Sequence, residues 1–519
     1  METCNARHVR APRVAPLASC LAAALAFGSG VFSPAHAKAF TERPAIGQLI
    51  ERLGPLDQVR KPLPLQPSLV TLLEPADSGR HRPAVPTGST IPVTNCNDDG
   101  PGSLRDAIEN LAVSGDTIDL TNTGCSTITL TTGSIFMPQA DLTLQGPGRS
   151  LIIDGNGAYS LRHTGSGTLA IYDLSVVDGR KYLDASYNID AKGGCVYSFG
   201  TAALVGTYLK YCTAATANSS YASLGGAVYG REAVIAVDST IILGNANGSG
   251  LSAGGAVYTP GMATIAYSQI GLSYSSGPTG GVFAPGGLFM KYSSVVNNSG
   301  TVAGGLYAAG NIFITNSTIA GNDAGAAGGA LFGGVGATGP ITLVDSTVSG
   351  NTAGAIGGLG LKYSAEISNS TIAFNSETNA SNTKYGAGIY TSNTLDLQSS
   401  IVSTNTLNHS VSGLLPDDLG GPGVLTGANN AMGLVLAPLD APPGTLFEDP
   451  KLAPLSFNGG LTATHALKPE SPVIDAGNNA AGLFVDQRGP GFPRVIGASA
   501  DIGAFEFDLD DLIFADNFD

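Results

Sequence analysis

The stretch Gly-Gly-Ala-Val-Tyr occupies residues 225–229 and again residues 254–258, and variants of it recur through the middle of the chain. The copies start 24 to 32 residues apart, at Gly193, Gly225, Gly254, Gly280, Gly304, Gly328, Gly357 and Gly386. A second phrase of the type Asp-Ser-Thr-Ile accompanies it, starting at Asp238, Tyr267, Tyr292, Asn316, Asp345, Asn369 and Gln398. A repeat of this length indicates a solenoid, a propeller or another array of similar units.

Each repeat contains two or three short runs of β-branched or alternating apolar residues, separated by Gly, Asn and Ser. Such runs predict strands joined by tight turns and leave no length for a crossover helix. One repeat cannot bury its own apolar side, but stacked coils with parallel strands about 4.8 Å apart would share a continuous core. We therefore predict an all-β solenoid, a parallel β-helix, because a propeller blade needs about 40 to 50 residues.

Asparagine recurs at one point of the repeat. Asn298, Asn322, Asn351 and Asn375 each lie six residues after the start of their own Asp-Ser-Thr-Ile phrase, whereas Asn245 and Asn405 are one residue out of register. Because Asn tolerates left-handed backbone and bonds to the local main chain, we predict that the four in register form a structural ladder at one turn.

Aromatic residues also recur once per repeat and predict a stack: Tyr197, Tyr229, Tyr258, Phe283, Tyr307, Phe332 and Tyr390. If Val228 points into the core, alternation turns Tyr229 outward, where such a stripe suits sugar stacking or protein contact. In the opposite phase the aromatic residues belong to the core. We favour a packing role, and the sequence leaves the phase open.

The composition limits the partners. The 519 residues carry a formal charge of −15, only 13% are charged, and Trp is absent. This balance argues against nucleic acid and anionic membrane surfaces as partners. An acidic surface of this kind is typical of a soluble exported protein.

The amino-terminal residues predict an export signal over residues 1–37. Three arginines precede an apolar run over residues 17–32, and Ala35-His36-Ala37 fits the small-x-small cleavage rule. A lipobox-like stretch ends at Cys20, but most of the apolar run follows it, so lipidation there is the less favoured alternative. No later stretch reaches the roughly 20 apolar residues of a spanning helix.

The remaining chain divides by composition into five parts. We predict a Pro-rich linker over residues 38–90, an amino-terminal cap with the first coils over 91–150, repeats over 151–415, a carboxy-terminal closing region over 416–507 and an acidic, aromatic tail over 508–519. Ser103 to Asp106 has the form of a capping box, and Ala107, Ile108 and Leu111 follow at helical spacing. A short helix here would shield the open end of the first coil.

Four cysteines remain after removal of the signal, and an even number in an exported chain favours disulfides. Cys96 with Cys125 would tie the cap to the first coil, and Cys195 with Cys212 would join two parts of one repeat. Metal ligation is the weaker alternative, because no Cys-x-x-Cys and no clustered His accompany them.

Two end regions carry a family resemblance. The run CNDDGPGSLRDAI over residues 96–108 resembles the start of bacterial secreted right-handed parallel β-helix proteins with a CSLREA-type motif. The repeats are similar to the pectin-lyase-like superfamily, and residues 449–478 with the following DQRGPGFPR resemble a choice-of-anchor region. The resemblance implies a right-handed β-helix that is exported to the cell surface or beyond. This fold hosts both enzymes and binding proteins.

The best candidate for a ligand site is a charged cluster in a long loop: Asp178, Arg180, Lys181, Asp184, Asp190 and Lys192. The loop before the Gly-Gly phrase is long here and over residues 214–224 and 376–385, and short in between, so the solenoid would carry a saddle for a glycan or a surface protein. Asp238 and Asp345 stand at equivalent positions, but four coils put them about 19 Å apart, beyond the 5 to 9.5 Å of a glycosidase pair.

We therefore predict no catalytic residues, no metal site and no cofactor. The favoured function is an exported, non-catalytic binding or adhesion module for glycan or protein. The alternative is a polysaccharide lyase or glycoside hydrolase on the same scaffold.

Overall fold

A computed structural model describes residues 88–325, 332–378, 385–409 and 413–509. The predicted signal, almost all of the linker and most of the tail lie outside these residues. Within them, no helix has the length and hydropathy that crossing a membrane requires.

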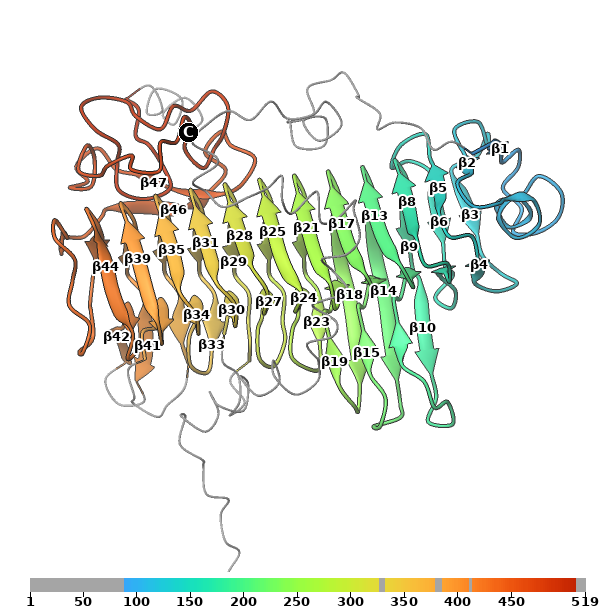
Figure 1. The fold of residues 1–519 in the computed structure, drawn as a ribbon, viewed down its shortest axis with the longest axis horizontal. Helices are drawn as coiled ribbons and strands as arrows, with labels where there is room; N and C mark the ends of the chain where they lie inside the picture. The colour runs from blue at the N-terminus through green and yellow to red at the C-terminus, as the bar shows by residue number, and fades with distance from the viewer. Residues whose placement is uncertain (1–87, 326–331, 379–384, 410–412, 510–519) are drawn as a thin grey trace, which may run out of the picture.

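The described chain winds in coils, and most coils give one strand to each of three parallel sheets (Figure 1). Sheet A runs from β1 (Thr90–Pro92) to β44 (Val424–Ala428), sheet B from β3 (Thr127–Thr129) to β45 (Ala431–Met432), and sheet C from β4 (Ile135–Met137) to β43 (Leu419–Gly420). Equivalent residues of successive coils are paired, for example Val196 with Val228 and Val228 with Val257. The predicted parallel β-helix is confirmed.

One apolar core fills the interior along the rod. In a single coil, Val228 of β16 (Val228–Gly230), Val234 of β17 (Ala233–Val237) and Ile241 of β18 (Thr240–Gly248) point inward and are fully buried. Each belongs to a different sheet, so the three walls meet on one column of β-branched and aliphatic side chains. Every coil thereby covers the apolar edge of its neighbour.

A serine ladder lies at the corner between sheets A and B. The backbone N–H of each serine donates to the hydroxyl of the next, at 3.0 to 3.2 Å, from Ser239 through Ser268, Ser293, Ser317, Ser346 and Ser370 to Ser400. These are the serines of the Asp-Ser-Thr-Ile phrases. The residue before each serine has a positive φ, as at Asp345 (43°), and the hydroxyl column satisfies the backbone of this tight bend.

An asparagine ladder lies at the corner between sheets B and C. The side-chain amide of each asparagine donates to the side-chain oxygen of the next at 2.9 to 3.0 Å, from Asn298 through Asn322, Asn351 and Asn375 to Asn405. The exclusion of Asn405 was therefore wrong. Ser399, not Gln398, is the equivalent of Asn369, so Asn405 does lie six residues into its phrase. Asn245 stays outside, and its side-chain oxygen is buried without a partner.

Carboxylates terminate these columns where the coils end. Asp418 accepts from the backbone and side-chain N–H groups of Asn405 at 2.8 and 2.9 Å, and Asp417 accepts from the backbone N–H groups of Gly386 and Ala387. Both are fully buried. Each carboxylate therefore replaces the acceptors that a further coil would supply.

The amino-terminal cap begins as predicted and then widens. Ser103 caps α6 (Leu104–Asp106), accepting from the N–H of Asp106 at 3.1 Å, and the chain continues into the π-helical turn η1 (Ala107–Leu111). The wider turn rotates Leu111 away from the core, so it is 56% exposed although Ile108 is buried. A disulfide joins Cys96 to Cys125 beside this cap.

The carboxy-terminal cap lies along the flank of the rod, above the last coils in Figure 1. It contains β46 (Leu452–Ser456) and β47 (Thr464–Leu467), and the rest of it is mostly irregular. It contacts successive coils through polar groups: Gln487 Oε1 accepts from Thr347, Asn316 donates to the carbonyl of Asp486, and Gly503 donates to that of Ser399.

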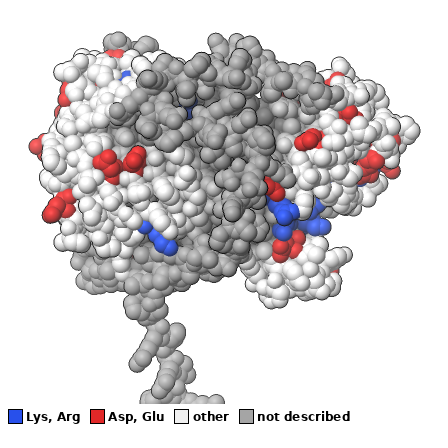
Figure 2. Space-filling view, viewed as in Figure 1, with Lys and Arg blue, Asp and Glu red and all other residues white. Residues whose placement is uncertain are grey.

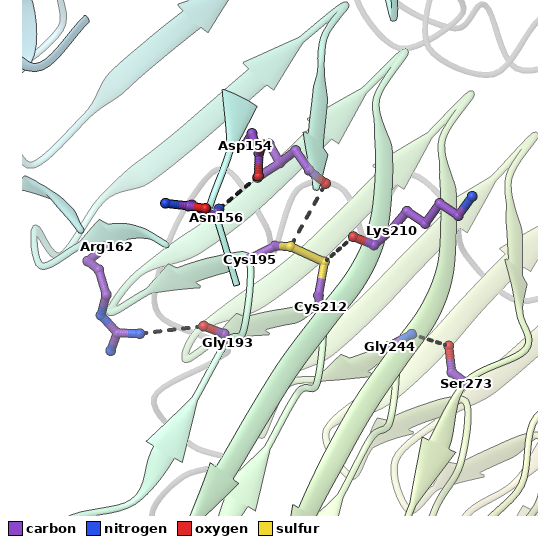
Figure 3. The surroundings of a disulfide bond; sticks show 10 residues. Asp154, Asn156, Arg162, Gly193, Cys195, Lys210, Cys212, Gly244 and Ser273 are labelled. Atoms are coloured by element: carbon purple, nitrogen blue, oxygen red, sulfur yellow. Dashed lines mark hydrogen bonds between the residues drawn. A yellow bond between two sulfur atoms is a disulfide. The ribbon is translucent and has the colours of Figure 1, made fainter. Parts of the chain in front are cut away.

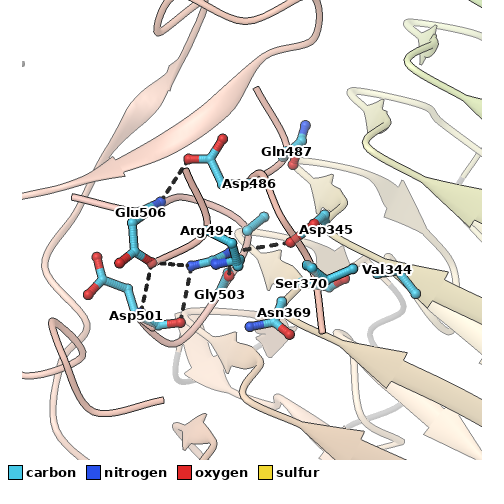
Figure 4. A network of polar contacts seen from close by, with 12 residues as sticks. Val344, Asp345, Asn369, Ser370, Asp486, Gln487, Arg494, Asp501, Gly503 and Glu506 are labelled. Atoms are coloured by element: carbon cyan, nitrogen blue, oxygen red, sulfur yellow. Dashed lines mark hydrogen bonds and ion pairs between the residues drawn. The ribbon is translucent and has the colours of Figure 1, made fainter. Parts of the chain in front are cut away.

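A buried ion network anchors the cap (Figure 4). Arg494, fully buried, donates to Asp345 of the serine corner at 3.2 Å and to Glu506 at 2.7 Å. Burial raises the pKa of Asp345 to about 8 and that of Glu506 to about 7, and the guanidinium opposes both shifts. The cap therefore depends on one cation shared by two carboxyl groups.

We predict that Asn322→Ala lowers the free energy of unfolding by about 3 kcal/mol, because it leaves several buried N–H and C=O groups without partners. Asn297→Gly is the matched control. Asn297 is exposed with φ 54°, so glycine should change stability by less than about 0.5 kcal/mol. Denaturant unfolding of both variants measures this, and equal effects would contradict the structural role of the ladder.

We predict that Glu377 makes stability fall as pH rises. This side chain is fully buried, neither oxygen has a hydrogen-bond partner among the described residues, and burial followed by the charge of Asp417 raises its pKa from 4.5 to about 9. The folded state keeps a proton that the unfolded chain releases above pH 4.5, so the unfolding free energy should fall between about pH 5 and 9, by at most about 1.4 kcal/mol per unit. Glu377→Gln should flatten this part of the profile; an unchanged slope would refute the assignment.

We predict that Arg494→Met detaches the cap, because two carboxyl groups are left buried without a cation, at a cost of about 3 to 5 kcal/mol. Limited proteolysis should then cut residues 433–507 while the coils resist. Arg149→Met removes the partly exposed ion pair with Asp238 and should cost less than about 1 kcal/mol. Equal protease resistance of the Arg494 variant and the wild type would refute the prediction.

Candidate functional site

An extension projects from the corner between sheets B and C in the early coils, and we call it the wing. There β10 (Arg180–Leu183) pairs with the long strand β14 (Tyr208–Thr216), which pairs with β18. The loops continue into a small parallel sheet of β11 (Ala191–Lys192), β15 (Ser223–Leu224) and β19 (Ser252–Ala253). Two of the three long loops predicted on one edge, over residues 180–192 and 214–224, thus lie side by side at the lower right of Figure 1. Most of the third, over residues 376–385, lies outside the described residues.

A disulfide fixes the base of the wing (Figure 3). Cys195, just before β12 (Val196–Ser198), is bonded to Cys212 in β14, and both are fully buried. The bond closes a loop of 17 residues that passes through all three sheets of one coil. Sheets B and C are therefore held together at the point where the wing begins.

The aromatic residues stack on the outer face of sheet C, under the wing. Successive ring centroids from Tyr197 through Tyr229, Tyr258 and Phe283 to Tyr307 lie 5.0 to 5.5 Å apart, with nearly parallel planes. Val228 points into the core, so Tyr229 points outward, yet Leu224 and Ala253 of the wing cover it. The sequence left open whether these rings point outward or into a core. They point away from the main core, and they pack with the wing residues in a second, smaller apolar core.

Phe332 does not continue the stack from its own strand, contrary to the sequence prediction. The equivalents of Tyr307 in the next two coils are Gly336 and Gly360, and the ring of Phe332 enters from the preceding loop to fill the space above both. The phrase in register is Gly333-Gly334, five residues after the one read from the sequence.

A cation replaces the ring at the open end of the stack. Arg162 in β7 (Leu161–His163) is the register partner of Tyr197, and its guanidinium lies 4.3 Å from the Tyr197 ring centroid. Its Nη1 donates to the carbonyl of Lys192 at 2.8 Å and, at 3.5 Å, to that of Gly193, the contact drawn in Figure 3. The column of rings thus ends in a stacked, hydrogen-bonded cation.

An open hollow of about 360 Å³ lies beside this cation, lined by Arg162, Ile189, Asp190, Lys192, Tyr197 and Tyr221. Lys192 is paired with Asp190 at 3.0 Å, and Asp190 also accepts from the backbone N–H of Ala222 at 2.9 Å. Burial lowers the pKa of Arg162 to about 10. Lys181 does not line the hollow, but it shares a face of β10 with Leu183, which packs against Ala191 of β11, so it faces the strand that carries Lys192. Burial and then the charge of Arg162 lower the pKa of Lys181.

The predicted charged cluster is divided. Asp190 and Lys192 line the hollow, and the other four predicted residues do not. Lys181 faces β11, Asp178 is exposed at the corner near Lys210, Arg180 lies over the Tyr182 ring, and Asp184 accepts from the N–H of Ser186. On the face drawn in Figure 2, Lys and Arg side chains gather over β10 and β14.

Sequence reasoning missed Arg162, Ile189 and Tyr221, and it treated Tyr197 only as part of the stack. Ile189 and Tyr221 belong to wing loops whose path the repeat does not specify. Alignment of Leu161-Arg162-His163 with Val196-Tyr197-Ser198 was the signal that could have revealed Arg162.

A buried Ser–His contact is structural. His163 Nδ1 lies 2.7 Å from Ser198 Oγ, and His163 Nε2 lies 2.9 Å from the carbonyl oxygen of Gln139. Both side chains are fully buried, so no substrate reaches them. Among the described residues, no group of three or more His, Cys, Asp or Glu is placed to hold a metal ion.

No family model matches this chain, and no curated protein matches it in sequence. Among solved structures, a crystal structure of the pectate lyase Pel9A is similar at a TM-score of 0.37 and 14% identity, over 81% of this chain and 97% of that one. A likeness at this level carries no argument about activity, and the architecture described above rests on strand pairing alone.

Proposed function

We propose that this protein is an exported, non-catalytic binding module that holds a glycan in the hollow at the wing. The observation that carries the proposal is the open end of the ring column, where Tyr197 lines a hollow together with Arg162, Lys192 and Asp190. Sugar rings stack on aromatic faces, and their hydroxyl groups need charged or amide partners arranged around that face. The disulfide at the base of the wing supports a preformed site.

The carboxylates of the hollow favour binding over hydrolysis. Asp190 is the one carboxylate among its lining residues, and it is engaged by Lys192 and by the N–H of Ala222. Hydrolysis of a glycosidic bond needs two carboxyl groups on opposite sides of that bond. A lone, ion-paired carboxylate fits a role in orienting hydroxyl groups.

Export to the cell surface or beyond is part of the proposal. It rests on the signal-like residues 1–37 and on two disulfides, which persist in oxidising compartments. We further propose that the two ends are the CSLREA-type entry motif and the choice-of-anchor region they resemble, with division at about residues 91, 151, 416 and 508. In this proposal the early coils present the wing, and the cap lies along the flank of the later coils.

We predict that Tyr197→Ala weakens glycan binding about two- to tenfold, because it removes an apolar wall of the hollow and the ring that supports the Arg162 guanidinium, together about 0.5 to 1.5 kcal/mol. A glycan array followed by calorimetry on the best ligand measures this. Tyr363→Ala is the control, since Tyr363 is 45% exposed in the later coils, outside the hollow. If the Tyr363 variant loses as much affinity, or if no glycan binds the folded wild type, the proposal fails.

A polysaccharide lyase is the second candidate, and one observation favours it. The lowered pKa of Lys181 beside Arg162 is what a base in β-elimination needs. Incubation with acidic polysaccharides, with and without Ca²⁺, would show ultraviolet absorbance from unsaturated sugar ends. Turnover that disappears in Lys181→Met would select the lyase over the binding module.

A further inference from the structure

We infer that the hollow at the wing is selective for an anionic group on the bound sugar, and that Arg162 and Lys181 form the subsite for that anion. The inference rests on the proposed function and adds the class of ligand. The group is a planar or tetrahedral oxyanion, a carboxylate or a sulfate ester, which a guanidinium can hold through two parallel N–H donors.

The first evidence is the incomplete pairing of Arg162. In the described part of the chain, the other arginines that are largely buried meet carboxylates: Arg105 meets Asp98 at 2.8 Å, Arg488 meets Asp486 at 2.9 Å, and Arg494 meets Asp345 and Glu506. Arg162 instead has two carbonyl oxygens and the Tyr197 ring, with no carboxylate among the described residues within ion-pair distance. Both of these hydrogen bonds come from Nη1, so Nε and Nη2 have no partner among the described residues, and Arg162 lines the hollow.

The second evidence is a like charge beside it. Lys181 is partly buried on the face of β10 that packs against β11, the strand whose Lys192 carbonyl accepts from Arg162, and it forms no ion pair with the described residues. After burial, the charge of Arg162 is a cause of its lowered pKa. Asp190, the carboxylate in the lining, is already neutralised by Lys192 at 3.0 Å. Two cations therefore share a partly dry site without a counter-ion, although the chain as a whole carries −15.

Such an arrangement is unfavourable in the empty protein and favourable with an anion. Two desolvated like charges repel each other, and each loses hydration that no protein group replaces. An oxyanion between Arg162 and Lys181 would remove the repulsion and satisfy the remaining N–H donors. A neutral sugar would leave both cations unpaired, so the site discriminates between sugars by the cost of that loss.

The ring beneath the guanidinium fixes how the anion is presented. Arg162 Cζ lies 4.3 Å from the centre of the Tyr197 ring, both side chains line the hollow, and Ile189 and Tyr221 complete the wall. A sugar could rest on these apolar walls with its charged group directed at the edge of the guanidinium. A free inorganic anion would use only the cations and would leave the walls uncovered.

The test compares matched ligands on the full chain. Calorimetry would measure affinity for an oligosaccharide of uronic acid and for the same oligosaccharide after carboxyl reduction, and in parallel for a sulfated oligosaccharide and its desulfated form. Inorganic sulfate alone provides the free-anion arm. We expect the wild type to prefer one charged form at least tenfold over its neutral partner, with the preference falling as salt is raised.

Two variants locate the preference. Arg162→Met should bring charged and neutral forms to within about twofold while keeping binding that depends on Tyr197, and Lys181→Met should reduce the preference partly. Lys210→Met is the control. Lys210 lies over the Tyr211 ring, outside the hollow, and its substitution removes the same positive charge from the protein. A Lys210 effect as large as that of Arg162 would show general attraction and overturn the inference.

The outcomes separate the two proposals. Equal binding of charged and neutral forms by the wild type overturns the anion subsite and leaves the glycan module standing. Inorganic sulfate that competes as well as the charged sugar would also overturn it, since the walls would then contribute nothing. Absence of binding to every oligosaccharide, in a chain whose unfolding transition is normal, rejects both.

Discussion

The bond from the backbone of one coil to a polar side chain of the next is the interaction on which this structure depends. Each coil turns sharply at corners that face the core, where water cannot satisfy the turning backbone. Serine supplies the acceptor at one corner and asparagine at the other, and each asparagine also donates to its successor. Apolar residues can then fill the rest of the interior, because the corners need no water.

The hydrogen bonds of both ladders run from each coil to the next one, and this direction explains the residues found at the end of the rod. Every N–H of a ladder points to the following coil, so the last coil must meet acceptors with no coil behind them. Asp418 ends the asparagine ladder, and Asn430 ends the serine ladder by accepting from Ser400 at 3.0 Å. The cap forms hydrogen bonds and ion pairs with groups on the outer side of the same corners. Asp345 can therefore be both a turn residue and an ion partner of Arg494.

The sequence predicted the features that repeat in every coil, and it did not predict the features that depend on loops of different length. The strands, the parallel stacking and the Asn298 to Asn375 ladder follow from spacing, because every coil repeats the same contact. Phe332 was misassigned because the sequence over residues 328–332 imitates the phrase that belongs five residues later. Arg162 and Tyr221 meet only through the wing, whose loops differ from coil to coil, so no period could bring them together.

The candidate site lies where the column of stacked rings ends, at the coil that has Arg162 in place of an aromatic residue. Inside the stack each ring has a ring on both sides, so it is saturated by its neighbours and has no face to offer a ligand. Tyr197 has a ring on one side and Arg162 on the other, and the coil of Arg162 precedes the small sheet that covers the later rings. Tyr197, whose two faces are taken by Tyr229 and Arg162, and an incompletely paired guanidinium therefore line the hollow together. An apolar wall beside a cation is the combination that recognition of a charged sugar requires.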